Sequence, residues 1–83
     1  MNYIGILDGS GDVWGVRVPD VAGCFGGGPT AYAAVLDAIE TLQSLRADNQ
    51  VPDAKPRSID EIMASGIEFD PSTEIYVMLP IGD

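Results

Sequence analysis

Three consecutive glycines followed by Pro29 and Thr30 separate an apolar N-terminal third from an alanine-rich segment. Glycine is the usual residue where the backbone must turn sharply or approach another segment closely. Thr30 suits a helix N-cap, because its hydroxyl can accept a hydrogen bond from an amide of the first turn. The run therefore predicts a tight transition from a turn into a helix. We expect at least one of Gly26, Gly27 and Gly28 to have a positive φ.

The residues before the glycine run have the pattern of β-strands. Tyr3–Leu7 and Val13–Val18 are rich in β-branched and aromatic residues, and a short polar loop with two glycines joins them as in a hairpin. In the second strand, alternation places Trp14, Val16 and Val18 on one face. Pro19 ends this strand, and residues 24–26 are expected to add a short third one.

A long helix is predicted after Thr30 and should end near Arg46. Its apolar positions follow helical spacing and comprise Tyr32, Val35, Leu36, Ile39 and Leu42. Residues 47–58 are polar, contain two prolines and are predicted to form a loop. A short helix should follow over residues 59–64, capped by Ser58 and ended by Gly66, before a last strand over Glu74–Pro80.

The predicted order is β-β-β-α-β, with a small helix before the last strand. This is an α+β fold with an antiparallel sheet, and we expect residues 1–83 to form a single domain. One long helix can cover only one face of the sheet, although the strands carry apolar residues on both. The second face must meet the short helix, a second copy of the chain or a partner, and we expect a homodimer or a higher homo-oligomer.

The charge of the chain favours some partners over others. Thirteen acidic residues face four basic ones, the net charge is −9 and there is no histidine. Such a chain repels nucleic acid and attracts a basic partner. The single cysteine, Cys24, cannot form an internal disulfide, and no apolar run approaches the ~20 residues of a membrane span. We expect a soluble, cytoplasmic protein that binds neither nucleic acid nor membrane.

Motifs for catalysis or metal binding are incomplete. The glycine run lacks the lysine of a phosphate-binding loop, and residues 8–12 begin like a calcium loop that the following residues do not continue. Zinc would require more histidine or cysteine, and Cys24 has no histidine base. We expect no cofactor, no metal and no enzymatic activity. The competing hypothesis is a Mg²⁺-dependent nuclease that uses Asp8 and Glu40.

The stretch "PDVAGCFGGGPT" followed by "AYAAVLDAIETL" resembles the HicB antitoxin family. The family's pattern is a strand ending in Pro-Asp-x-x-Gly-Cys, then Gly-x-Thr, then an alanine-containing amphipathic helix. The later segments "KPRSIDEIMASG" and "IYVMLPI" resemble its proline-bearing loop, its small helix and its closing strand. The positions that match the turn and cap in register are Pro19, Asp20, Gly23, Cys24, Gly28 and Thr30.

The resemblance implies a partial RNase H-like fold and an antitoxin role. The implied partner is a small basic HicA-like toxin that cleaves mRNA, which suits the acidic charge. The expected toxin-binding residues are Asp8, Asp12, Trp14, Asp20 and Phe25, with the aspartates imitating RNA phosphates. The alternative for Asp20 is a local role in its own turn. Many members continue into a DNA-binding domain, which we do not expect within these residues. A structural oligomerisation domain without a toxin is the remaining alternative.

Overall fold

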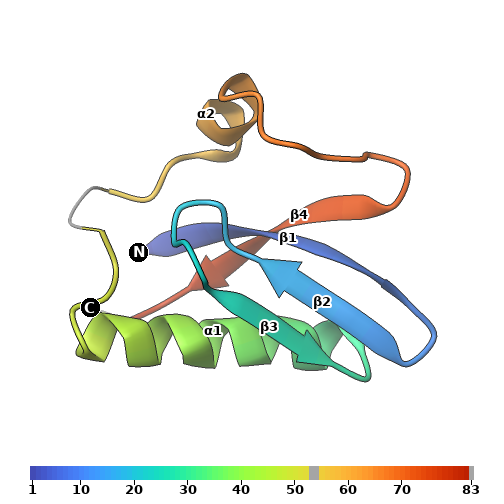
Figure 1. Ribbon diagram of the computed structural model, residues 1–83, viewed down its shortest axis with the longest axis horizontal. Coiled ribbons are helices and arrows are strands. Elements are labelled where there is room, and N and C mark those ends of the chain that lie inside the picture. The colour runs from blue at the N-terminus through green and yellow to red at the C-terminus, as the bar shows by residue number, and fades with distance from the viewer. Residues whose placement is uncertain (53–54, 83) are drawn as a thin grey trace.

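The structure is a computed structural model that describes residues 1–52 and 55–82. Strands β1 (Asn2–Ser10), β2 (Val13–Arg17) and β3 (Phe25–Gly28) precede helix α1 (Ala31–Ala47). Helix α2 (Ile59–Ala64) and strand β4 (Glu74–Pro80) complete the fold, which is the predicted order (Figure 1). The third strand begins and ends later than expected. Residues 53–54 of the predicted loop lie outside the described residues.

The four strands form one antiparallel sheet in the order β3-β2-β1-β4. The closing strand therefore pairs with the first, and β3 and β4 lie at the two edges. Helices α1 and α2 lie on opposite sides of the sheet (Figure 1). We call the side covered by α1 the inner face and the other side the outer face. No helix in the described part of the chain is long and apolar enough to cross a membrane.

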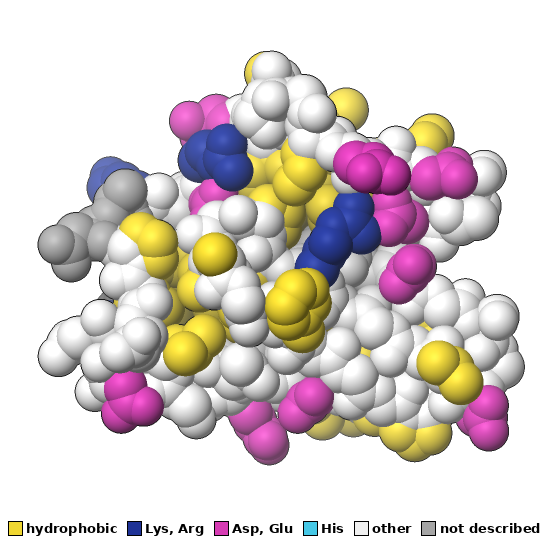
Figure 2. Space-filling model, in the orientation of Figure 1, with side chains coloured by type: hydrophobic (Ala, Val, Ile, Leu, Met, Phe, Trp, Pro, Cys, Tyr) yellow, Lys and Arg dark blue, Asp and Glu magenta, His cyan; other side chains and the backbone are white. Residues whose placement is uncertain are grey.

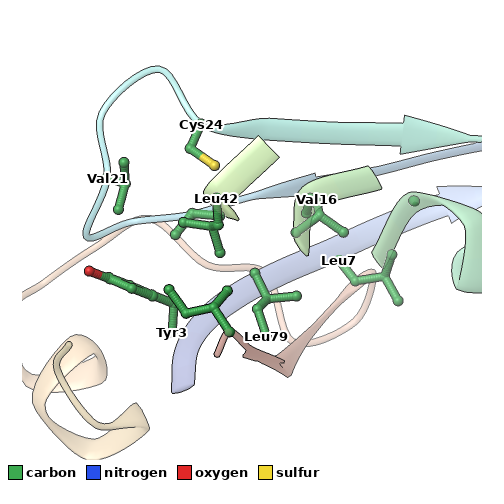
Figure 3. Close-up of a cluster of buried hydrophobic side chains, with 11 residues drawn as sticks. Tyr3, Leu7, Val16, Val21, Cys24, Leu42 and Leu79 are labelled. Atoms are coloured by element: carbon green, nitrogen blue, oxygen red, sulfur yellow. The ribbon is translucent and has the colours of Figure 1, made fainter. Parts of the chain in front are cut away.

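The main core lies between α1 and the inner face. Figure 3 shows side chains from the strands meeting Leu42 of α1 and the turn residues Val21 and Cys24. The strand residues in this cluster include Tyr3, Leu7, Val16 and Leu79, each at most 5% exposed. The alternation predicted for β2 is confirmed, because Val16 and Val18 are buried here while Val13 is exposed.

The buried stripe of α1 differs from the one predicted. Ala34, Ala38 and Leu42 are fully buried, whereas Tyr32 and Leu36 are exposed to solvent. The helix packs against β3, whose glycines present no side chains on the inner face. Small alanines therefore occupy the contact with β3, whereas Leu42 is buried as predicted and Val35 and Ile39 are partly buried against the core. Size complementarity with the glycine strand decided the buried face, which helical spacing by itself could not show.

The prediction of a positive φ within the glycine run is wrong. Positive φ occurs instead at Gly23, with φ 79°, in the turn before β3. Gly26–Gly28 are extended strand residues, and their lack of a side chain serves close packing. A Cβ on Gly26 would lie 2.5 Å from the main-chain nitrogen of Ala38, and one on Gly28 would lie 2.8 Å from the Cβ of Ala33. The run lets α1 lie directly on the strand.

Helix α2 covers part of the outer face. The Ser58 hydroxyl accepts from the Glu61 amide while the Glu61 carboxylate accepts from the Ser58 amide, which forms a capping box. Ile62 is fully buried, and a hollow lined by Ile4, Ile59 and Met78 marks where α2 lies over the strands. No helix in residues 1–52 and 55–82 covers the remainder of the outer face, and the candidate site lies there.

Candidate functional site

The strand registers place four side chains in a row across the outer face. Arg17 of β2 pairs with Phe25 of β3 on one side and with Ile6 of β1 on the other, and Ile6 pairs with Tyr76 of β4. Because paired residues share a face, an aromatic ring lies at each end of the row. Ile6 is only 1% exposed, whereas Phe25 is 63% exposed. The row therefore has a buried centre and an exposed apolar end.

A second row lies beside the first and ends in two carboxylates. Asp8 pairs with Gly15 of β2 and with Glu74 of β4. Gly15 carries no side chain, so a hollow opens between the rows, lined by residues that include Asp8, Arg17 and Phe25. The two rows together bring an acid, a base and an exposed ring into one small area.

Arg17 connects this area to the loop before β4. Its guanidinium donates to a carboxylate oxygen of Glu74 at 2.5 Å and to the main-chain oxygen of Glu68 at 2.6 Å. About a third of the Arg17 side chain is exposed, and 11% of Glu74 is. The other Glu74 oxygen accepts from the Asp70 amide at 2.8 Å. The Phe69 ring stacks on Tyr76 with 4.2 Å between ring centroids, so several contacts hold the loop on the sheet.

Asp70 of this loop and Glu74 at the start of β4 are stabilised in their charged form. Arg17 and the Asp70 amide hold the pKa of Glu74 below its ordinary value. Hydrogen bonds from Ser72 lower the pKa of Asp70 in the same way. With Asp8 and Glu68, they outnumber the single guanidinium, and Figure 2 shows acidic side chains gathered around a basic one on this side of the molecule. We call Asp8, Phe25, Glu68 and Asp70 the acidic outer patch.

The structure separates the predicted toxin-binding residues. Asp8 and Phe25 lie together on the outer face. Asp12 is exposed in the hairpin turn, and Trp14 lies on the inner face, where a Cβ on Gly9 would meet its ring. The Trp14 indole N–H donates to the Gly11 carbonyl oxygen at 3.0 Å, which ties the side chain to its own hairpin.

The carboxylate of Asp20 is engaged within the fold. One oxygen accepts from the Arg57 amide and the other from its guanidinium, each at 2.6 Å. The Asp20 side chain is 10% exposed. Asp20 thus joins the turn after β2 to the segment before α2 and holds these two segments together.

The turn and cap residues act locally. Gly23 has a positive φ, Cys24 is buried, and the Thr30 hydroxyl accepts from the Ala33 amide at 3.0 Å. The Val18 amide donates to the Cys24 carbonyl oxygen, which closes the loop that Pro19 begins. These residues position β3, and hence Phe25, at the edge of the outer face.

Asp8 and Glu40 do not converge on one point. Asp8 projects from the outer face, whereas Glu40 is exposed on α1, which covers the inner face. The sheet therefore lies between the two carboxylates. Among residues 1–52 and 55–82, no three His, Cys, Asp or Glu side chains gather closely enough to hold a metal ion.

Sequence reasoning missed the residues that organise the patch. Arg17, Glu68, Phe69 and Glu74 come from two segments more than fifty residues apart, and only the strand order joins them. One signal was available, because Arg17 is the only basic residue among the first 45.

Comparison with solved structures assigns the fold to a known class, the N-terminal domains of HicB antitoxins. The crystal structure of the N-terminal domain of Burkholderia pseudomallei antitoxin HicB matches 99% of both chains, with a TM-score of 0.70 and 20% sequence identity. The crystal structure of the Burkholderia pseudomallei antitoxin HicB matches with a TM-score of 0.66 and 20% identity over 98% of this chain. This chain spans 63% of the length of that longer protein. No protein-family profile and no curated protein sequence matches the chain.

Proposed function

We propose that this chain is an antitoxin-type binding module that neutralises a small, basic, HicA-like mRNA-cleaving toxin in the cytoplasm by direct contact, without catalysing a reaction itself. The observation that carries the proposal is the acidic outer patch on a fold shared with a HicB antitoxin domain. On this proposal, residues 1–83 act as one toxin-binding domain. The resemblance from Pro19 to Leu42 points to the same role.

The chemistry of the patch suits a basic protein surface. Asp8, Glu68 and Asp70 are exposed carboxylates that can pair with lysine or arginine, and Phe25 offers an exposed ring beside them. Aromatic side chains are enriched at the core of protein interfaces, and the rim around that core is polar. Long-range attraction to the net charge of −9 would speed the encounter. The patch would then set the orientation of the bound toxin.

The decisive experiment measures binding to the small basic protein encoded by the adjacent gene. Stopped-flow association at several salt concentrations should show an association rate that falls as salt rises, because screening weakens the steering. An RNA-cleavage assay beside it should show that the chain protects RNA from that protein and does not cleave RNA alone. Absence of binding, or Mg²⁺-dependent cleavage by this chain alone, would overturn the proposal.

A matched pair of double variants separates local contact from overall charge. Asp8→Asn with Glu68→Gln removes two charges from the patch, whereas Glu40→Gln with Asp48→Asn removes two from α1 and its C-cap, on the other side of the sheet. Both pairs change the net charge equally, but the patch charges would lie nearest the bound toxin, so the patch pair should slow association more than the helix pair. Only the patch pair should also speed dissociation, by about 10-fold or more. Equal dissociation rates would place the toxin elsewhere on the surface.

A further inference from the structure

The two edges of the sheet are finished differently. At the β3 edge, the outward amide of Gly27 donates to the Asp37 carboxylate of α1 at 2.9 Å. A charged side chain at this edge opposes pairing with another strand. At the other edge, β4 pairs with β1 and with no other strand of the described residues. One outward amide of the glycine edge is therefore engaged by a charged side chain, whereas Tyr76 and Met78 at the β4 edge have no such contact in residues 1–52 and 55–82.

The alternation of hydrogen-bonded and non-bonded pairs along β4 identifies the residues whose main-chain N–H and C=O groups point away from β1. Met1 and Ile81 exchange hydrogen bonds in both directions, at 3.5 and 3.0 Å. Because bonded and non-bonded pairs alternate in an antiparallel ladder, the pairs Tyr3 with Leu79 and Gly5 with Val77 are also bonded. The alternate residues of β4 consequently direct their N–H and C=O groups away from β1.

The open stretch is short and has defined ends. Among the outward residues, Glu74 donates its amide to the Asp70 carbonyl oxygen at 2.8 Å, and Pro80 has no amide hydrogen. Tyr76 and Met78 remain, and no main-chain hydrogen bond from their outward groups occurs in residues 1–52 and 55–82. They lie on either side of Val77. Each has one donor and one acceptor, so the free groups form a self-complementary set.

The side chains of the β4 edge are suited to contact a second copy of the same uncharged strand rather than a basic protein. Residues 75–80 carry no charge in a chain whose net charge is −9. Ile75 and Met78 are 58% and 57% exposed, one on each face of the strand. A basic protein would find no carboxylate to pair with along residues 75–80. A second copy would meet a neutral, apolar strand with matching donors and acceptors.

We infer that two copies of this chain pair through antiparallel β4 strands, with the two-fold axis at Val77. Tyr76 of each copy then exchanges hydrogen bonds with Met78 of the other, and the two sheets become continuous. The pairing buries the β4 edge and leaves the acidic outer patch free. It goes beyond the proposed antitoxin function and does not depend on it.

The axis position makes a geometric prediction that disulfide cross-linking can test. Val77 would face its own symmetry mate as a non-bonded pair, with Cα atoms about 4.5 Å apart, which is within the range of a disulfide. The two copies of Ile75 would lie roughly 13 Å apart along the strands, too far for a disulfide. Ile75 is more exposed than Val77. If exposure alone controlled disulfide formation, Ile75→Cys would therefore cross-link faster than Val77→Cys.

The experiment compares mild oxidation of Val77→Cys, Ile75→Cys and the unaltered chain, whose Cys24 is buried. Val77→Cys should form a covalent dimer at least ~10-fold faster than Ile75→Cys, and the unaltered chain should form none. Sedimentation of the unaltered chain should show a dimer at high micromolar concentration. Amide exchange at Tyr76 and Met78 should slow as concentration rises.

Two controls keep the result interpretable. Met78→Lys should weaken the dimer, whereas Met63→Lys, an equally exposed methionine on α2, should not. Circular dichroism of each variant checks that the monomer is folded. A monomer at all concentrations, or equal cross-linking of the two cysteine variants, would overturn the inference. So would slow exchange at Tyr76 and Met78 that occurs only when the toxin is added, which would assign the edge to the toxin.

Discussion

A Cβ atom on Gly26 would lie 2.5 Å from the main-chain nitrogen of Ala38 and 2.6 Å from the carbonyl oxygen of Ala34. Strand β3 and helix α1 therefore pack backbone against backbone at this point. No side-chain movement can relieve such a contact, because both sides of it are main chain. This closeness ties the edge strand to the helix and fixes where Phe25 lies.

Gly26→Ala should therefore destabilise the fold, by about 1–3 kcal/mol, since the added methyl forces the helix away from the sheet. Gly27→Ala is the matched control, because its Cβ would lie 3.5 Å from the nearest atom, the Trp14 carbonyl oxygen. Urea denaturation of the two variants measures the difference in free energy of unfolding. Similar midpoints for both would contradict the close packing.

The Arg17–Glu74 pair should make stability depend on pH. The folded-state pKa of Glu74 is lowered, chiefly by its hydrogen bond to Arg17. The pair's contribution is therefore present above the unfolded value of about 4.3 and is lost as pH falls through the lower, folded value. Glu74→Gln should be less stable than the unaltered chain at neutral pH, and the gap should close in acid. Thermal melts between neutral pH and acid measure it.

The control for this prediction is the same substitution in an Arg17→Met background. Without the guanidinium, Glu74→Gln should lose most of its pH-dependent effect, leaving the part due to the Asp70 amide. An unchanged pH dependence in that background would assign the shift to another group.

Cys24 should be poorly reactive in the folded protein. The side chain is 1% exposed, and burial raises the pKa of its thiol, so little thiolate is present and reagents cannot reach it. Reaction with an aromatic disulfide reagent should be at least ~100-fold slower in the native state than in urea. Ala22→Cys, at an exposed position of the same turn, should react rapidly in both conditions. Fast native labelling of Cys24 would show that the turn opens readily.

Local signals were sufficient for the elements themselves. The cap at Thr30, the helix over residues 59–64 and the alternation in β2 each depend on residues close together in the chain. Such patterns reflect hydrogen bonds and burial within one element, so they can be recognised in the sequence. The resemblance to HicB antitoxins was based on the turn before the long helix, on that helix, and on the later loop, small helix and closing strand. The shared fold agrees with it.

Tertiary packing decided which strands and side chains lie next to one another. The sequence could not show that β4 pairs with β1, that Arg17 reaches Glu74 fifty-seven residues away, or that Phe25 and Asp8 share a face. It also led to the wrong prediction of a positive φ within the glycine run, because the closeness of Gly26 to Ala38 is a property of two segments. The sequence alone determined which segments are strands and helices, through local bonding and periodicity. Only the tertiary structure determined the strand register and the face of the sheet on which each side chain lies. Both depend on contacts between segments far apart in the chain, and the local sequence pattern is compatible with more than one such arrangement.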